Sequence, residues 1–206
     1  MKKERLGELI ANAVSHGVGI VFGVTALIVL LQRADQPIMI SAVLLFSLSL
    51  ILLYTASTLF HAFPNSMKRV FNVFQRLDHA GIYILIAGTY TPLILLLVPS
   101  LKGYILLGVL WTIAITGVVF KSIWIHKFKT VHLLMYLLMG WSVVFVWSDM
   151  SQAISPNALR FLWIGGLSYT VGVIFYIQRF TYAHFIWHLF VLSGSLFHFM
   201  SIYTLL

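Results

Sequence analysis

The sequence predicts an all-α integral membrane protein, a bundle of seven transmembrane helices in a single domain that covers residues 1–206. Three observations predict this fold class. Only 9% of the residues are charged and 61% are hydrophobic, whereas about a quarter of a soluble domain is charged. The apolar residues gather in seven runs, each long enough or nearly so for a helix to cross the ~30 Å hydrocarbon layer. The gaps between the runs are too short to form a soluble domain.

Each charge-free run is predicted to be one membrane-spanning helix. The first contains Gly19 and Gly23, whose spacing favours close packing against another helix. The third contains Pro92, which predicts a kink. The fifth and sixth runs are the shortest, and the seventh carries three histidines. The runs lie at approximately 13–32, 38–60, 80–98, 103–120, 131–147, 161–178 and 182–206.

The distribution of basic residues predicts the orientation in the membrane. Seven spans place the two termini on opposite sides. With the N-terminus inside, the inner segments carry ten Lys and Arg residues, and the outer segments carry Arg33, Lys102 and Arg160. The positive-inside rule therefore predicts a cytoplasmic N-terminus and an outer C-terminus in the cell membrane. The net charge of +8 is explained by these topology signals, so we expect no nucleic-acid partner.

A pair of histidines four residues apart in the last run is the most specific chemical signal. On a helix, His184 and His188 share one face about 6 Å apart along the axis, an arrangement typical of metal sites. His61, at the inner end of the second run, lies at the same predicted depth and is the expected third ligand. A lone interfacial histidine more often bonds to backbone or lipid, but three at one depth favour a metal. Cysteine is absent, which excludes thiolate ligands.

Two further polar residues are expected beside this cluster. Ser57 precedes His61 by four residues and so lies one turn deeper on the same face, where it can bond to bound water or a substrate carbonyl. A serine bonded to its own helix is the alternative. Asp78, at the start of the third span, can orient water or accept its proton. Its alternative role is to cap the third helix.

Glu8, Asn12 and His16 form a polar stripe on the inner end of the first span. Such a stripe faces the bundle or the headgroups, so support of the metal ligands and simple solvation at the interface are both open interpretations. Other histidines are not expected to bind the metal. His198 lies about 15 Å deeper and should bond across helices. His126 and His132 should be solvated near the inner surface.

The motifs Glu8-x-x-x-Asn12-x-x-Ser15-His16, Ser57-x-x-x-His61, Asp78-His79 and His184-x-x-x-His188 resemble those of the bacterial haemolysin III proteins. These are the prokaryotic branch of the progestin and adipoQ receptor family. The resemblance covers nearly the whole chain. It implies seven helices with an inner N-terminus and a Zn²⁺ site with His61, His184 and His188 as ligands. Asp78 would contact the zinc through water, and Ser57 would lie beside it.

The resemblance also implies a relation to membrane metal-dependent hydrolases, among them the alkaline ceramidases. The first functional hypothesis is therefore zinc-dependent hydrolysis of a lipid amide or ester, with a membrane lipid as substrate. A non-enzymatic zinc-binding sensor or structural protein remains an alternative, as does a cytolytic protein. A retinal protein is disfavoured because the last run has no lysine for a Schiff base. The sequence makes no prediction of oligomeric state.

Overall fold

The computed structural model describes residues 6–64, 66–125 and 127–206, and it confirms an all-helical bundle with seven segments able to cross a membrane. The fifth segment is a composite of two α-helices and an intervening 3₁₀ helix. The segments are α1 (Leu6–Leu31), α2 (Pro37–Ala62), α3 (Lys68–Leu97), α4 (Leu101–Ile123), α5 (Lys129–Trp141) with η1 (Ser142–Val146) and α6 (Trp147–Ala153), α7 (Pro156–Tyr176) and α8 (Ala183–Tyr203).

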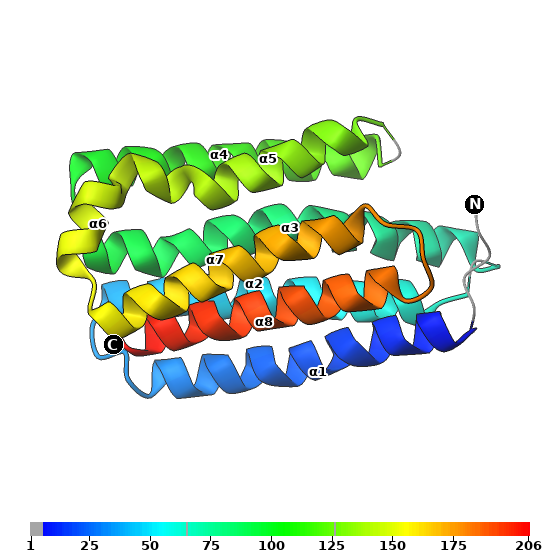
Figure 1. Ribbon diagram of the computed structural model, residues 1–206, viewed down its shortest axis with the longest axis horizontal. Coiled ribbons are helices and arrows are strands. Elements are labelled where there is room, and N and C mark those ends of the chain that lie inside the picture. The colour runs from blue at the N-terminus through cyan, green and yellow to red at the C-terminus, as the bar shows by residue number, and fades with distance from the viewer. Residues whose placement is uncertain (1–5, 65, 126) are drawn as a thin grey trace.

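The helices run alternately up and down along the long axis of the molecule (Figure 1). We call the end where α1 begins the N-terminal end, and the end where α8 finishes the C-terminal end. The helices α2 and α3 pack together, as do α1 with α2 and α7 with α8, while α4 packs on α3. The pair α1 and α8 also meets, which brings the first and last helices of the chain side by side. This closure places residues from the two termini of the sequence in one site.

Glycines permit the closest helix contacts. A Cβ atom on Gly19 of α1 would lie 2.6 Å from the ring of Tyr54 on α2, and one on Gly117 of α4 would lie 2.6 Å from the ring of Tyr83 on α3. Gly23 likewise faces α2, where its Cβ would meet Ile51 at 3.0 Å. The two glycines of α1 therefore form a packing face, as their spacing predicts.

Three helices begin at least five residues before the charge-free runs predict, among them α7, which starts at Pro156 instead of residue 161. The first helix starts at Leu6 instead of residue 13, and α3 starts at Lys68 instead of residue 80. The added turns of α3 carry the exposed side chains of Lys68, Arg69 and Arg76. A charge-free run reports only the length of helix in hydrocarbon, whereas backbone hydrogen bonding continues a helix into the headgroup region. The α3 helix therefore projects beyond the predicted membrane boundary.

The fifth span is not one regular helix, because α5 gives way to five residues of 3₁₀ helix in η1. The hydroxyl of Tyr90 on α3 donates to the carbonyl of Gly140 at 2.7 Å and accepts from the amide of Val143 at 2.8 Å. These bonds satisfy the Gly140 carbonyl and the Val143 amide near the change in helix type. Such backbone groups need a protein partner there, because the bilayer interior supplies no water. A residue from another helix thus supports the break.

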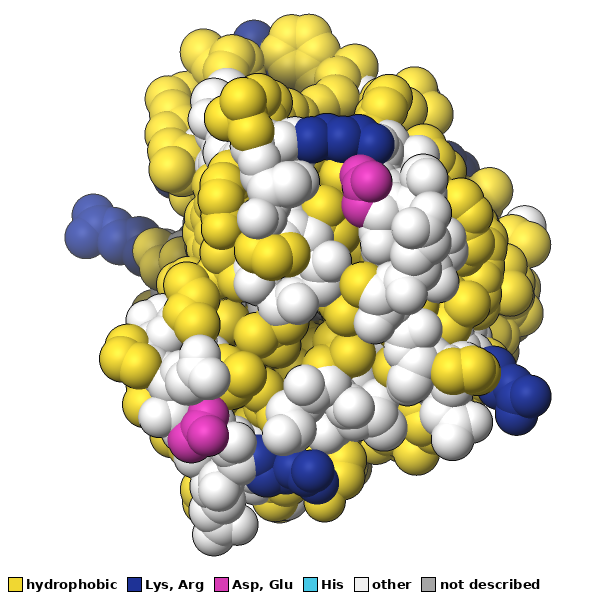
Figure 2. Space-filling view, turned by 90° about the vertical axis from the view of Figure 1, so that its left-hand side faces the viewer, with side chains coloured by type: hydrophobic (Ala, Val, Ile, Leu, Met, Phe, Trp, Pro, Cys, Tyr) yellow, Lys and Arg dark blue, Asp and Glu magenta, His cyan; other side chains and the backbone are white. Residues whose placement is uncertain are grey.

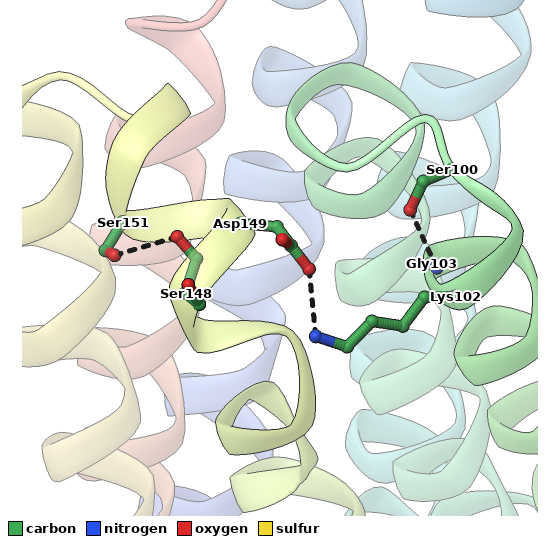
Figure 3. Close-up of polar contacts among 6 residues, drawn as sticks. All are labelled: Ser100, Lys102, Gly103, Ser148, Asp149 and Ser151. Carbon is green, nitrogen blue, oxygen red and sulfur yellow. Dashed lines mark hydrogen bonds and ion pairs between the residues drawn. The ribbon is translucent and has the colours of Figure 1, made fainter.

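The C-terminal end carries few charges among its hydrophobic side chains (Figure 2). One ion pair joins α4 to α6 there, with Lys102 Nζ 2.9 Å from the carboxylate of Asp149 (Figure 3). At the start of α4, the hydroxyl of Ser100 accepts from the amide of Gly103 at 3.3 Å, which caps the helix (Figure 3). The candidate functional residues lie at the opposite, N-terminal end.

Candidate metal centre

Three imidazoles meet at the N-terminal end of the bundle. His61 lies in the last turn of α2, and His184 and His188 lie in the first two turns of α8. One nitrogen from each ring lies within 4.8 Å of the other two. The ring centroids are 5.2 Å apart for His61 and His184, 5.1 Å for His61 and His188, and 4.6 Å for His184 and His188. The structure thus brings together the three residues predicted as ligands, and the group could hold a metal ion.

Contacts with helix α1 determine which ring nitrogen of His188 carries the proton and which keeps a lone pair. Nδ1 of His188 lies 3.2 Å from the carbonyl oxygen of Asn12 and 3.1 Å from the hydroxyl oxygen of Ser15. The Ser15 hydroxyl itself donates to the same carbonyl at 2.9 Å, so it faces His188 as an acceptor. Because a carbonyl oxygen can only accept, we assign the ring proton of His188 to Nδ1. Nε2 then keeps its lone pair for a metal, as in many histidine metal sites.

The remaining geometry also fits a divalent ion. Nε2 of His61 is buried and has no hydrogen-bond partner among the described residues, which is unusual for a buried polar atom. Tetrahedral coordination by imidazole places ligand nitrogens about 3.4 Å apart. The separations within the cluster allow such an arrangement, and a set of three neutral nitrogens suits zinc and related transition metals.

Ser57 lies one turn before His61 on α2, and Asp78 lies on α3 next to His79. The Asp78 side chain is 13% exposed, and its carboxylate is 3.5 Å from Nδ1 of His79. It is not within ligand distance of all three imidazoles, so direct membership in their group is not supported. The hydroxyl of Ser57 is fully buried near the Asp78 carboxylate, although the two lack the geometry of a formed hydrogen bond. The alternative role of Asp78 as a helix cap is wrong, because α3 begins ten residues earlier at Lys68.

The polar stripe of α1 lies against the start of α8. The carboxylate of Glu8 accepts from the backbone amide of Tyr182 at 2.7 Å, at the residue that precedes α8. The ring of His16 stacks on that of His188 with centroids 3.5 Å apart. The side chain of Asn12 is buried, and neither its nitrogen nor its oxygen has a partner among the described residues. Each residue of the stripe thus faces the bundle at the height of the histidine cluster.

Comparisons with known proteins show the family to which the chain belongs. The family described as haemolysin-III related matches residues 6–199 of the chain. The chain belongs to this haemolysin III family. It is 39% identical over 192 residues to Hemolysin-3 of Bacillus cereus, which covers 91% of this chain and 87% of that protein. It is 37% identical over 192 residues to the Hemolysin-3 homolog of Bacillus subtilis (strain 168), with 91% and 89% covered.

A mammalian relative extends the family beyond bacteria. The chain is 29% identical over 206 residues to the human monocyte to macrophage differentiation factor, with 95% of this chain and 83% of that protein covered. Membership in the haemolysin III family confirms the resemblance drawn from the histidine, serine and aspartate motifs. With the seven apolar helices, it identifies a multi-pass membrane protein, as predicted.

The other histidines of this haemolysin III family member have different roles. Nε2 of His198 bonds to the carbonyl of Leu162 on α7 at 3.3 Å, which confirms the predicted bond across helices. His132 was expected to be solvated, and this expectation is wrong. The side chain is buried, and Nδ1 lies 2.7 Å from the hydroxyl of Tyr83. His126 lies outside the described residues.

A second polar cluster lies deeper in the bundle, and sequence patterns did not reveal it. The Tyr54 hydroxyl donates to the Ser195 hydroxyl at 2.6 Å, and the Tyr169 hydroxyl lies 2.8 Å from the same oxygen. The ring of Tyr54 also packs edge-on against His16, with centroids 5.0 Å apart. These residues come from three helices and share no motif spacing. They support α1, α2, α7 and α8 beneath the histidine cluster.

An apolar cavity of about 150 Å³ lies between α2, α3, α5, α7 and α8. Its walls include Leu53, Tyr136, Tyr176 and Trp187. Tyr176 also lies next to the histidine cluster, with its ring centroid 6.3 Å from that of His184. Tyr176 therefore separates the histidine cluster from a space suited to hydrocarbon.

Proposed function

We propose that this haemolysin III protein is a metal-dependent hydrolase that cleaves an amide or ester bond of a membrane lipid. His61, His184 and His188 would hold Zn²⁺, with Asp78 and Ser57 as the residues that handle protons and orient the substrate. The convergence of the three imidazoles from α2 and α8 carries the proposal. With the N-terminus in the cytoplasm, as the basic residues predict, the centre would lie near the cytoplasmic interface of the cell membrane.

The residues around the cluster suit this chemistry. A bound zinc ion would polarise a carbonyl oxygen and make water a stronger nucleophile at neutral pH. Asp78 is an acceptor for the proton that water loses, and it can return that proton to the leaving group. Ser57 is a donor to the carbonyl oxygen of the substrate, because its buried hydroxyl lacks a partner among the described residues. The Nδ1–H of His188 stays on Asn12 and Ser15, which keeps that ring in one orientation.

The surroundings favour a lipid over a water-soluble substrate. The cavity is apolar along most of its wall, and one of its lining residues, Tyr176, lies next to His184. A hydrocarbon chain placed there leaves water, which supports binding through the hydrophobic effect. The amide or ester linkage of such a lipid would then lie towards the histidine cluster, at the headgroup end of the chain.

The test is hydrolysis by purified protein in lipid nanodiscs. Zn²⁺-loaded wild type is incubated with a panel of ceramides, acyl amides and glycerol esters, and released fatty acid is measured by mass spectrometry. Asp78→Asn should lower turnover by about 100-fold or more, as expected for loss of a general base. Asp149→Asn is the matched control, since that carboxylate pairs with Lys102 at the opposite end. Turnover by wild type no greater than by Asp78→Asn over the whole panel would contradict catalysis.

A structural or sensory metal is the second candidate. A metal held by one ligand from α2 and two from α8 would tie these helices together without any reaction. In that case, removal of zinc by a chelator should lower the melting temperature, and His61→Ala should lower it similarly. Stability loss without hydrolysis in the nanodisc assay favours this candidate.

Cytolysis is the third candidate, because the names of both Bacillus relatives denote haemolysis. It predicts leakage of dye from lipid vesicles after addition of purified protein. If leakage requires Asp78 and His184, lipid turnover is its cause. If leakage is independent of both residues, the protein permeabilises the membrane by another route.

A further inference from the structure

Lys121 is a buried lysine near the end of α4, only 3% exposed. It follows Gly103, Leu110, Ala114 and Gly117 on the face of α4 that packs against the bundle. Gly117, one turn earlier, lies against the ring of Tyr83, so α4 approaches α3 closely at this level. A lysine withdrawn from water is costly unless a counter-charge accompanies it. Lysines inside membrane bundles for this reason often mark binding sites. Among the described residues, Nζ of Lys121 is not one of the fully buried polar atoms that lack a partner, so the ammonium group can still reach an anion at the surface of the bundle.

No carboxylate in the described part of the chain pairs with Lys121. Within residues 6–64, 66–125 and 127–206, Lys121 forms neither a hydrogen bond nor an ion pair. Asp149 pairs with Lys102 at the opposite end, and Asp78 lies against His79. Glu8 bonds to the start of α8, and Asp35 lies between α1 and α2 at the C-terminal end. Glu4 lies outside the described residues.

Lys129 adds a second positive charge near Lys121, and two imidazoles lie in the same group. The charge of Lys121 interacts with His79 on α3, with His132 on α5 and with Lys129 at the start of α5. Two lysines and two imidazoles therefore come together from three helices. The imidazole of His132 is held by Tyr83, and Nδ1 of His79 bonds to the carbonyl of Gln75 at 2.8 Å. The group thus combines two lysine cations with two imidazoles held by hydrogen bonds, and the Asp78 carboxylate contacts one of these imidazoles, that of His79.

We propose that Lys121 and Lys129 bind the phosphate of an anionic membrane lipid at the N-terminal ends of α3 and α5 and the C-terminal end of α4. This site is separate from the three-histidine cluster and does not depend on hydrolysis. The same cations would attract free phosphate, but the surroundings favour a lipid. Val119, Phe120 and Ile123 expose large apolar side chains on the same end of α4, where acyl chains can lie. Trp124 is exposed just beyond them, as expected at headgroup level.

The experiment measures lipid binding to delipidated, full-length protein by native mass spectrometry. Phosphatidylglycerol and phosphatidylcholine with identical acyl chains are titrated in a neutral detergent. Wild type should bind phosphatidylglycerol more tightly. Lys121→Gln should weaken that binding about fivefold and leave phosphatidylcholine unchanged, since one interfacial lysine contributes roughly that factor. Lys121→Arg should retain the preference.

Lys68→Gln is the matched control, because Lys68 is exposed at the same end of the bundle. A preference for phosphatidylglycerol that is unchanged in Lys121→Gln, or reduced equally in Lys68→Gln, would overturn the proposal. If Lys121→Gln does not fold, the comparison is made on the wild type alone. Equal affinity of the wild type for phosphatidylglycerol and phosphatidylcholine would then overturn the proposal. Binding of inorganic phosphate without any preference between the lipids would also overturn it in favour of a free anion. Zinc content measured in Lys121→Gln should equal that of wild type, which separates this site from the metal centre.

Discussion

Replacement of Ser15 by alanine tests whether α1 orients a ligand of the proposed metal centre. In the wild type, the Nδ1–H of His188 has two acceptors, the Ser15 hydroxyl at 3.1 Å and the Asn12 carbonyl at 3.2 Å. Ser15→Ala removes the first acceptor and leaves the second. Removal of a hydrogen bond that orients a metal ligand typically lowers metal affinity by about 10- to 100-fold. Because one acceptor remains, we expect a loss near the lower limit, about tenfold.

The assay is competition for Zn²⁺ between purified protein and a fluorescent chelator of known affinity. Ser122→Ala is the control, because Ser122 is an exposed serine at the same end of the bundle that bonds only to its own helix at Val118. It should leave the zinc affinity unchanged. The absorption spectrum of bound Co²⁺ should keep a tetrahedral character in Ser15→Ala, since all three ligands remain. If Ser15→Ala leaves the zinc affinity unchanged, the hydrogen bond from Nδ1–H of His188 to Ser15 does not contribute to metal binding, and the reasoning is refuted.

Three further predictions follow from the packing and from the ligand set. Gly19→Ala should destabilise the protein by about 1–3 kcal/mol, because the new methyl group would lie 2.6 Å from the Tyr54 ring. Gly108→Ala, which has open space around it, should not lower the melting temperature. Tyr90→Phe should cost about 1–3 kcal/mol and increase hydrogen exchange at Val143, because it removes the bonds that support η1. Zinc affinity should fall as the pH is lowered, because each histidine must be neutral to bind; a pH-independent zinc titration would contradict coordination by histidine.

The sequence was sufficient to locate the seven spans but not all of their limits. Charge-free runs follow the hydrocarbon layer, so they missed the first turns of α3, where Lys68 and Arg69 extend the helix beyond it. The change of helix type at η1 could not be predicted from residues 142–146, because it depends on Tyr90 of another helix. The inner location of the N-terminus rests on the distribution of basic residues and stays a prediction.

For the candidate site, regular spacing was informative where the partners share a helix. The four-residue interval predicted that His184 and His188 share a helix face, and the predicted depth of His61 placed it at the same level; the structure brings the three together. The contacts of α1 with His188 were not predictable in detail, because they join residues 173 and 176 positions apart. Lys121 was interpreted as a topology signal, since its burial depends on how closely Gly117 lets α4 approach α3. Sequence patterns report the face of a helix but not the distance to its neighbour.

The contact between α1 and α8 has a consequence for biogenesis. During synthesis, α1 enters the bilayer first and α8 last, so His188 meets Ser15 only after every intervening span has been inserted. A partly inserted chain has neither the histidine pair nor its oriented ring. If the cluster holds the proposed metal, capture becomes possible only at the end of translation, and metal loading would report that the whole bundle has assembled.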